Sequence, residues 1–231
     1  MSEKRCIIVG GGDFEPSLLP QKGEGDLLIA ADSGYAALEK MGLLPDICIG
    51  DFDSLGYEPA ECPVFRLPVE KDDTDMVAAA RIGMERGYTE FLFLGVLGGD
   101  RFSHSIAAVQ TLGWLLKQGA RGKILDRRCR VSAVDDRIAW PASTRGSVSV
   151  FALGGEAEVS MEGVKYSLCR HKLDIFPLGV STSFVGLPAY IAVHEGAVLV
   201  VEEPEACFYG NLWLKYEKTC IKILTSAGGI R

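Results

Sequence analysis

Two short acidic runs, at residues 51–54 and 71–75, carry the side chains best suited to chemistry. The first reads Asp-Phe-Asp-Ser and the second Lys-Asp-Asp-Thr-Asp, and each comes after apolar residues typical of a buried strand. Carboxylates crowded in this way repel one another unless a cation lies between them. Mg²⁺ binds oxygen ligands, usually one or two protein carboxylates together with water and substrate phosphates. The two runs therefore indicate a magnesium site that handles phosphate groups.

The same residue types also have an ordinary structural use. Asp, Ser and Thr are common in turns and at helix N-caps, so Asp53 with Ser54 can close a strand. Thr74 or Asp75 can likewise cap the helix that follows, where negative side chains are favoured. Three aspartates within residues 72–75 exceed what one cap needs. Taken together, the two runs favour a functional site.

Composition narrows the class of protein. A chain of 231 residues, 48% hydrophobic and 24% charged, predicts a globular protein with one large domain or two modest ones. A net charge of −7 argues against a broad nucleic-acid surface, which needs basic residues to neutralise phosphates. No apolar run approaches the ~18 residues of a membrane span, and the first residues lack a signal-peptide pattern. We expect a cytoplasmic protein without nucleic-acid or membrane partners.

The seven cysteines are odd in number and show no C-x-x-C spacing. Several stand inside apolar runs, as Cys6 and Cys48 do, where a free cysteine behaves as a small buried hydrophobe. The pattern predicts reduced thiols in the core.

The first half of the chain alternates between strand and helix patterns. Strands are expected at residues 6–9, 27–31, 47–50, 64–67 and 91–94, and helices over 35–41, 76–86 and from about 105 to 117, the last with an apolar stripe of Ile106, Val109, Leu112 and Leu116. Arg101 and His104 then fall at a strand-to-helix turn, the edge at which open α/β sheets bind ligands. Gly10 to Gly12 follow the first strand and can bring backbone amides close to phosphate, but the full dinucleotide fingerprint is absent.

The pattern changes after residue 126. Short alternating runs at 130–134, 147–153, 157–161 and 197–201, separated by Gly, Pro and Ser, predict an all-β sandwich or barrel. We place a domain boundary near Arg127, giving domains 1–127 and 128–231. Residues 203–231 have no clear assignment, and an edge strand or an interface segment are both compatible with them.

Seven motifs follow one another along the chain: Ala31-Asp32-Ser33-Gly34, Pro45-Asp46, Gly50-Asp51-Phe52-Asp53-Ser54, Lys71-Asp72-Asp73-Thr74-Asp75, Arg101-Phe102-Ser103-His104, Gly163-Val164-Lys165-Tyr166 and Val180-Ser181-Thr182-Ser183. In this order they resemble the motifs of thiamine pyrophosphokinases. The resemblance covers about residues 5–202, and its most specific part is Gly-Asp-x-Asp-Ser at residues 50–54 followed by Asp-x-Thr-Asp at residues 72–75. It implies an α/β N-terminal domain with a mainly parallel sheet, an all-β C-terminal sandwich domain, and a homodimer with active sites at the subunit interface. It also implies the reaction, in which ATP and thiamine give thiamine diphosphate and AMP.

The resemblance implies roles for individual residues. The positions that hold Mg²⁺ are matched by Asp51, Asp53 and Asp72. Asp75, grouped with them as catalytic, caps its helix, binds metal or accepts the hydroxyl proton. The nucleotide side is assigned to Asp32, Ser33, Ser54, Thr74, Arg101 and His104, and the thiamine side to Lys71, Tyr166 and Ser183. The structural alternatives are a surface ion pair for Arg101, a simple hydrogen-bonding role for His104 and a half-buried strand aromatic for Tyr166.

Three positions near the expected chemistry depart from the family pattern. Ser103 stands where Asp is usual, and Ala108 and Phe184 stand where Asn is usual. These changes remove a charge and several hydrogen-bonding groups, which predicts weaker nucleotide or thiamine affinity or an altered substrate. The alternative functions are another Mg²⁺-dependent phosphotransferase or nucleotide hydrolase, and a non-catalytic nucleotide or thiamine sensor.

Overall fold

A computed structural model describes residues 4–53, 55–68, 74–177 and 179–205. Ser54, Lys71 and Asp72, three of the expected site residues, lie outside this range, as do Cys207 and Cys220. The chain divides into two compact units, Met1–Asp126 and Arg127–Arg231. No helix among the described residues is long and apolar enough to cross a membrane.

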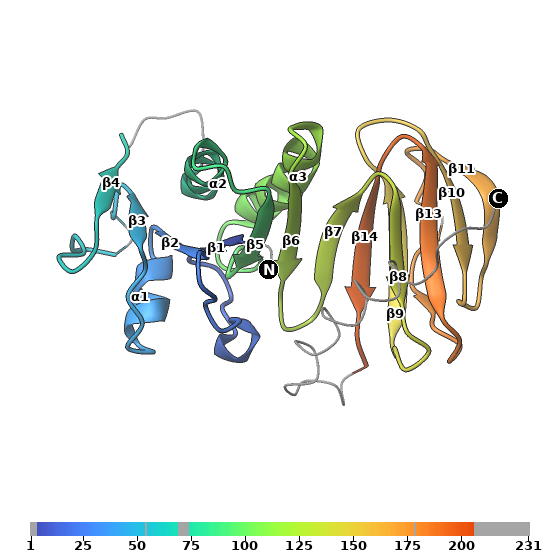
Figure 1. Cartoon of the computed structure of the whole chain (residues 1–231), viewed down its shortest axis with the longest axis horizontal. Coiled ribbons are helices and arrows are strands. Elements are labelled where there is room, and N and C mark those ends of the chain that lie inside the picture. The colour runs from blue at the N-terminus through green and yellow to red at the C-terminus, as the bar shows by residue number, and fades with distance from the viewer. Residues whose placement is uncertain (1–3, 54, 69–73, 178, 206–231) are drawn as a thin grey trace. The chain divides into compact units, whose positions relative to one another are not determined.

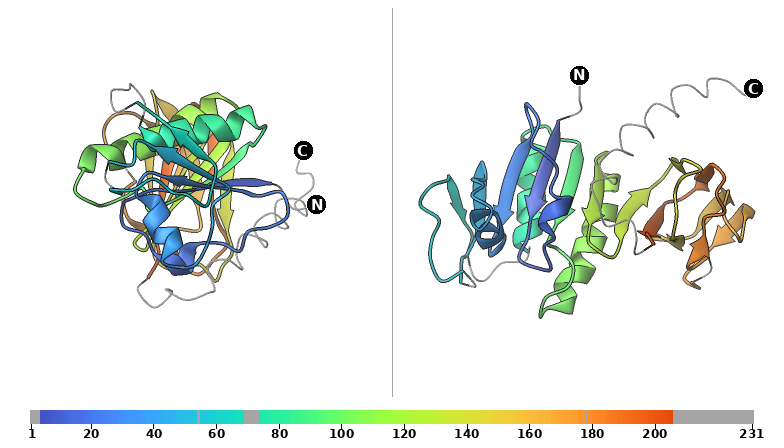
Figure 2. Two further views of the ribbon diagram at one scale, coloured as in Figure 1. Left: turned by 90° about the vertical axis from the view of Figure 1, so that its left-hand side faces the viewer. Right: turned by 90° about the horizontal axis from the view of Figure 1, so that it is seen from below.

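Unit 1 is built on parallel strands. Its strands are β1 (Arg5–Val9), β2 (Leu27–Ala31), β3 (Ile47–Gly50), β4 (Val64–Arg66), β5 (Glu90–Leu94) and β6 (Arg121–Leu125). They lie in the order β6-β5-β1-β2-β3-β4, and the pairs between them are parallel. β1 and β5, far apart in the sequence, lie side by side with Ile8 opposite Phe93 (Figures 1 and 2). The strand order therefore reverses between β1 and β5, which makes this a topological switch point.

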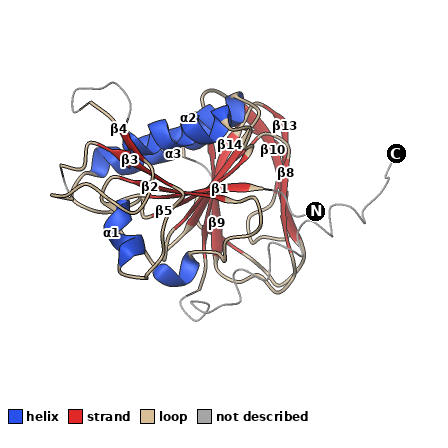
Figure 3. Cartoon of the chain, turned by 60° about the vertical axis from the view of Figure 1, so that its left-hand side comes forward, coloured by secondary structure: helices blue, strands red, loops and turns tan. Residues whose placement is uncertain are grey.

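Helices cover both faces of the unit 1 sheet. They are the short 3₁₀ helix at Pro16–Leu18, α1 (Gly34–Glu39), α2 (Asp75–Glu85) and α3 (Phe102–Lys117). Figure 3 shows α2 and α3 together on one face and α1 on the other. All five residues of β2 are buried accordingly. Parallel strands covered on both faces read as continuous apolar runs, which explains why the sequence revealed them.

The apolar stripe expected on α3 was right for Leu112, which is fully buried, and wrong for Ile106, which is 46% exposed. Val109 and Leu116 are half-buried. The other buried side chains of the helix are Ser105, Ala108, Thr111 and Leu115. The reason lies on β6, where a Cβ added to Gly122 would come within 2.8 Å of Leu112 and 2.9 Å of Leu115. The missing side chain lets α3 approach the sheet on this face, and the sequence of the helix alone does not reveal that.

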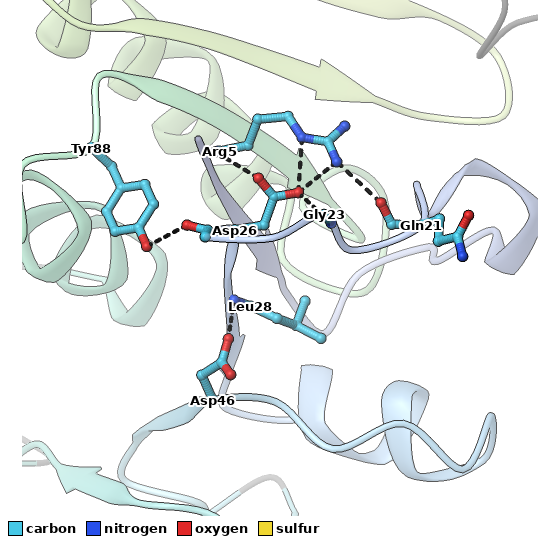
Figure 4. Close-up of polar contacts among 8 residues, drawn as sticks. Arg5, Gln21, Gly23, Asp26, Leu28, Asp46 and Tyr88 are labelled. Carbon is cyan, nitrogen blue, oxygen red and sulfur yellow. Dashed lines mark hydrogen bonds and ion pairs between the residues drawn. The ribbon is translucent and has the colours of Figure 1, made fainter. Parts of the chain in front are cut away.

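Two aspartates fix the start of β2 (Figure 4). Asp26 accepts hydrogen bonds from the backbone N–H of Arg5 at 2.8 Å and from its guanidinium Nη2 at 2.6 Å. Asp46, from the Pro-Asp motif, accepts a hydrogen bond from the backbone N–H of Leu28 at 2.7 Å. Asp46 thus connects the loop before β3 to β2. The aspartate of the Pro-Asp motif therefore has a structural role.

Unit 2 contains antiparallel strands in two sheets. The strands are β7 (Arg130–Val134), β8 (Arg137–Trp140), β9 (Ser147–Ala152), β10 (Ala157–Glu162), β11 (Leu168–Leu173), β12 (Thr182–Ser183), β13 (Ala189–Glu195) and β14 (Val198–Glu203). Within this unit β12-β9-β14-β7 are neighbours, and β11-β10-β13-β8 form a separate sheet. Val150 and Val200 from the first set join Val159 and Ile191 from the second in one hydrophobic cluster. Both sheets therefore contribute to a shared core.

The prediction that all cysteines are reduced was wrong for two of them. Cys48 and Cys62 form a disulfide, although Cys6 is a buried free thiol as expected. Burial raises the pKa of Cys6 to about 12, so this thiol is chemically inert. The backbone N–H of Cys48 donates to the carbonyl of Pro63 at 2.9 Å, which brings Cys62 alongside β3. The pairing of β3 with the segment that leads into β4 decides which cysteine bonds to Cys48. The spacing of the cysteines along the sequence does not decide it.

Candidate active site

Three carboxylates meet at the carboxyl ends of β2 and β3. Asp32, Asp51 and Asp53 each offer an oxygen, and these oxygens all lie within 4.8 Å of one another. Asp32 directly follows β2 and Asp51 directly follows β3, and the two strands are parallel neighbours. Neighbouring parallel strands end at the same edge of a sheet, so their following residues come together. The expected metal set was Asp51, Asp53 and Asp72, whereas the described structure adds Asp32 to the first two.

The backbone around this acidic cluster, defined as Asp32, Asp51 and Asp53, is unusual. Asp32 and Phe52 have positive φ angles of 49° and 60°. Aspartate tolerates the left-handed region, but for a bulky residue such as phenylalanine it is an outlier. Phe52 is 5% exposed and packs in the unit 1 core, which offsets the strain. Its buried ring anchors the chain between Asp51 and Asp53, and the N–H of Asp53 donates to the carboxylate of Asp51 at 3.2 Å.

Gly50 allows Asp32 and Asp51 to approach each other. Its φ is +155°, and a Cβ added there would lie 3.1 Å from the Cα of Asp32. The N–H of Asp32 donates to the carbonyl of Ile49 at 2.8 Å. A side chain at position 50 would push these two segments apart. The glycine of the Gly-Asp-x-Asp-Ser motif is therefore explained by close backbone contact.

The glycine loop after β1 lies at the switch point beside Ser33. A Cβ added to Gly11 would lie 1.9 Å from the hydroxyl oxygen of Ser33. The N–H of Gly12 donates to the carbonyl of Gly95, just after β5, at 2.6 Å. Residues 10–12, Ser33 and the start of the loop after β5 are therefore neighbours. Residues 10–12 alone are weak evidence for a phosphate-binding loop. A second glycine-rich stretch at residues 95–99, directly after β5, is the sequence feature that strengthens this interpretation.

Thr74 and Asp75 begin α2. Thr74 is the N-cap, and its hydroxyl accepts a hydrogen bond from the N–H of Val77 at 3.3 Å. Asp75 is the first residue of the helix and lies in its first turn, where a negative charge complements the helix dipole. The cap expected at one of these two positions is thus Thr74, and Asp75 is not the N-cap.

Arg101 and His104 lie at the N-terminus of α3, as expected for a strand-to-helix turn after β5. Both side chains are exposed, and the N–H of His104 donates to the carbonyl of Arg101 at 3.0 Å. Ser105, which the sequence did not single out, is buried and accepts a hydrogen bond from the N–H of Gly98 at 3.1 Å. This bond fixes the turn that presents Arg101. Ala108, one of the departures from the family pattern, is 1% exposed and faces the core.

Tyr166 and Ser183 lie on neighbouring segments of unit 2. The N–H of Tyr166 donates to the Thr182 hydroxyl at 3.0 Å, and the N–H of Lys165 donates to the carbonyl of Ser183 at 2.9 Å. Tyr166 is 62% exposed, so its ring is accessible to a ligand. The side chain of Lys165 stands over that ring, with Nζ 5.3 Å from the centroid.

Phe184, another departure from the family pattern, has a packing role. Its ring meets the ring of Trp140 edge to face, with centroids 5.3 Å apart and planes inclined by 63°. It also packs against the unit 2 core. Phe184 therefore places a partly buried aromatic ring where the family pattern has the polar side chain of asparagine. Ser103, the third departure, is exposed.

Comparison with known proteins shows what this arrangement is similar to. Residues 22–124 match the family described as "Thiamin pyrophosphokinase, catalytic domain", a range that includes the acidic cluster, α2 and α3. The resemblance to the thiamine pyrophosphokinase family is confirmed. The match ends inside β6, so it concerns unit 1.

Individual relatives agree with the family match. The thiamine pyrophosphokinase of Bacillus subtilis is 29% identical over 133 residues, which cover 54% of this chain and 62% of that protein. The aligned part thus spans less than two thirds of its relative. A solved Bacillus subtilis thiamine pyrophosphokinase superposes with a TM-score of 0.77 at 21% identity, covering 87% of this chain and all of that one. The Candida albicans structure gives 0.69 at 12% identity, covering 87% and 89%. These structural similarities establish the fold.

The donor set of the acidic cluster fits Mg²⁺. All three groups are carboxylates, the hard oxygen ligands that this ion prefers. Ligands around Mg²⁺ stand about 3 to 4 Å apart, because each lies at about 2.0–2.1 Å from the ion. Oxygens within 4.8 Å of one another would draw closer together to share one ion.

Proposed function

We propose that the protein is a thiamine pyrophosphokinase, an ATP:thiamine diphosphotransferase. The hydroxyethyl oxygen of thiamine attacks the β-phosphorus of ATP, and the bond from that phosphorus to the oxygen of the α-phosphate breaks. Thiamine diphosphate and AMP are the products. The observation that carries this proposal is the acidic cluster, which lies inside a segment that matches the family's catalytic domain.

The carboxylates neutralise phosphate charge through bound metal. We assign Asp32 to the metal-binding set together with Asp51, Asp53 and Asp72, because its carboxylate meets the first two. Mg²⁺ bound there would supply positive charge to the phosphates of ATP. Since Thr74 is the cap of α2, we keep Asp75 among the catalytic carboxylates, as a metal ligand or as the acceptor of the hydroxyl proton.

The nucleotide lies, in this proposal, along the carboxyl edge of the unit 1 sheet. Support comes from the glycine loop and Ser33, which stand at the switch point where α/β proteins bind ligands. Arg101 acts as the phosphate clamp, because a guanidinium is permanently charged and binds phosphate through two nitrogens. His104, in the same helical turn, provides a further donor to phosphate. Ser54 and Thr74 keep their assignment to the nucleotide.

Thiamine is assigned to unit 2, with Lys71 as an additional contact. The exposed ring of Tyr166 offers a face to the cationic thiazolium, and Ser183 lies on the neighbouring segment. We accordingly interpret residues 1–127 as the α/β catalytic domain and residues 128–231 as a β-sandwich for thiamine binding and dimerisation. We also propose a cytoplasmic homodimer with active sites at the subunit interface.

The reaction itself provides the test. The purified protein is incubated with ATP, Mg²⁺ and thiamine, and matched reactions omit thiamine or the metal, with products separated by HPLC. Thiamine diphosphate and AMP appearing together, only in the complete mixture, support the proposal. Release of AMP or ADP without thiamine indicates another phosphotransferase or hydrolase. Absence of product despite ligand-induced stabilisation indicates a sensor.

A further inference from the structure

The disulfide closes the loop that carries two of the three cluster carboxylates. Cys48 is the second residue of β3 and Cys62 lies just before β4, and their Cα atoms are 6.5 Å apart. The residues enclosed between them, 49–61, include Asp51 and Asp53. The bond therefore joins the two ends of this segment, and the mechanism proposed above makes no use of it.

Noncovalent contacts also hold this loop to unit 1, among them an ion pair of 2.9 Å between Glu58 and Arg66 of β4. Phe52 is buried in the core, and the hydroxyl of Tyr57 donates to the carboxylate of Glu39 on α1 at 2.5 Å. The rings of Tyr57 and Tyr35 meet edge to face with centroids 6.3 Å apart. Tyr57 is 45% exposed, so its contacts compete with water. The disulfide adds a covalent constraint at the base of the loop, beside the hydrogen bond from the N–H of Cys48 to the carbonyl of Pro63.

The two sulfur atoms differ in access to solvent. Cys48 has no exposed surface, whereas Cys62 is half-buried at the surface of the core. A soluble dithiol can therefore reach the disulfide from the Cys62 side. Disulfides accessible in this way are the ones that exchange readily.

We propose that the Cys48–Cys62 disulfide positions Asp51 and Asp53 for Mg²⁺, and that its reduction by a dithiol weakens metal binding and so slows the enzyme. In the reduced protein only noncovalent contacts hold the loop, and the carboxylates lose part of their preorganisation. The effect on turnover rests on the proposed function, but the effect on Mg²⁺ binding does not.

The exchange balances as an ordinary two-electron reduction. One thiolate of the dithiol attacks the sulfur of Cys62, the bond between the two protein sulfurs breaks, and Cys48 leaves as a thiolate that takes up a proton. The second thiol of the dithiol then displaces Cys62 and closes a cyclic disulfide. Two electrons pass from the dithiol to the protein. Disulfides in reducing compartments are usually transient or redox-sensing, which agrees with a regulatory use.

Titration of the full-length protein with Mg²⁺ alone, by isothermal titration calorimetry, tests the proposal. The oxidised protein and the protein reduced with dithiothreitol are compared, after peptide mapping without reductant has located the bridge. We expect affinity about tenfold lower after reduction, the smaller end of the range for groups that orient metal ligands, and recovery on reoxidation. Cys62→Ala should bind Mg²⁺ with the affinity of the reduced protein, and dithiothreitol should not change that affinity. Cys169→Ala, which removes an exposed free thiol, should respond like the unmodified protein.

Several outcomes overturn the proposal. They are free thiols at Cys48 and Cys62 in the oxidised protein, equal affinity in the two redox states, and no Mg²⁺ binding in either. If Cys62→Ala fails to fold, the reversible comparison on the unmodified protein still decides. A redox-dependent affinity without any thiamine diphosphate formation would refute the proposed function and leave this inference standing.

Discussion

Gly50 lies so close to Asp32 that a Cβ at position 50 would stand 3.1 Å from the Cα of Asp32. The contact joins the ends of β2 and β3 and sets the distance between two of the cluster carboxylates. Position 50 is also at a φ of +155°, which side chains rarely adopt. Packing and backbone conformation thus require glycine for separate reasons.

Gly50→Ala is expected to weaken Mg²⁺ binding and to destabilise the fold by about 1–3 kcal/mol, the usual cost of a strained backbone conformation. Calorimetric titration and urea denaturation measure the two effects. Gly87→Ala is the matched control, because Gly87 has a φ of +81° with nothing within 4 Å of an added Cβ. It should lose stability but keep its Mg²⁺ affinity. Equal metal affinity in both variants would contradict the spacing role of Gly50.

Asp53→Asn should abolish turnover, with a loss of at least about 100-fold in kcat/KM, while changing stability by no more than about 0.5 kcal/mol. The asparagine keeps the size of the side chain and removes the charge that binds metal, and Asp53 is exposed. Product formation by HPLC and thermal denaturation are the measurements. Glu85→Gln, an exposed charge removal on α2, serves as the control and should be fully active. Near-normal activity of Asp53→Asn would refute the metal role.

Tyr166→Ala should raise the KM for thiamine by about 5- to 30-fold, as expected for loss of a cation–π contact of about 1–2 kcal/mol. The KM for ATP should stay constant, because the ring is assigned to the vitamin. Tyr166→Phe retains the aromatic face and should behave like the unmodified protein. Initial-rate kinetics with each substrate varied in turn separate the two constants. An equal rise in both would show that the residue acts through folding instead.

The pKa of Asp26 predicts a pH-dependent contribution to stability. Burial alone would raise this pKa, but the hydrogen bond from the Arg5 side chain, with those from the backbone N–H groups of Gly23 and Arg5, outweighs burial and lowers the pKa below its ordinary value of 3.8. A lowered folded-state pKa means that the ionised form favours folding. The contribution is therefore complete above the ordinary pKa and is lost as the pH falls through the lower value of the folded protein.

Asp26→Asn should cost about 1–3 kcal/mol at pH 7, since it weakens hydrogen bonds in a partly buried ion pair. Urea denaturation of both proteins from pH 7 to pH 3 gives the difference in unfolding free energy. That difference should stay constant down to about pH 5 and shrink below about pH 4. A difference that does not change with pH would disprove the linkage.

The local sequence pattern predicted the strands of unit 1 better than those of unit 2. Strands β2 and β3 were predicted with the bounds that the structure has, because strands covered on both faces consist of unbroken apolar residues. Strands β8, β11, β12 and β13 were missed. The register between β10 and both β11 and β13 shifts, which interrupts the alternation of buried and exposed residues on which strand prediction depends.

The sequence by itself determined which residues are chemically competent: the aspartates of the two acidic runs, the arginine before α3 and the family to which their motifs point. Only the tertiary structure decided which of them meet. Asp32 joins Asp51 and Asp53 because β2 and β3 are parallel neighbours, and Cys48 joins Cys62 because β3 pairs with β4. Spacing along the chain encodes local conformation, whereas these contacts depend on which strands pair with one another in the sheet.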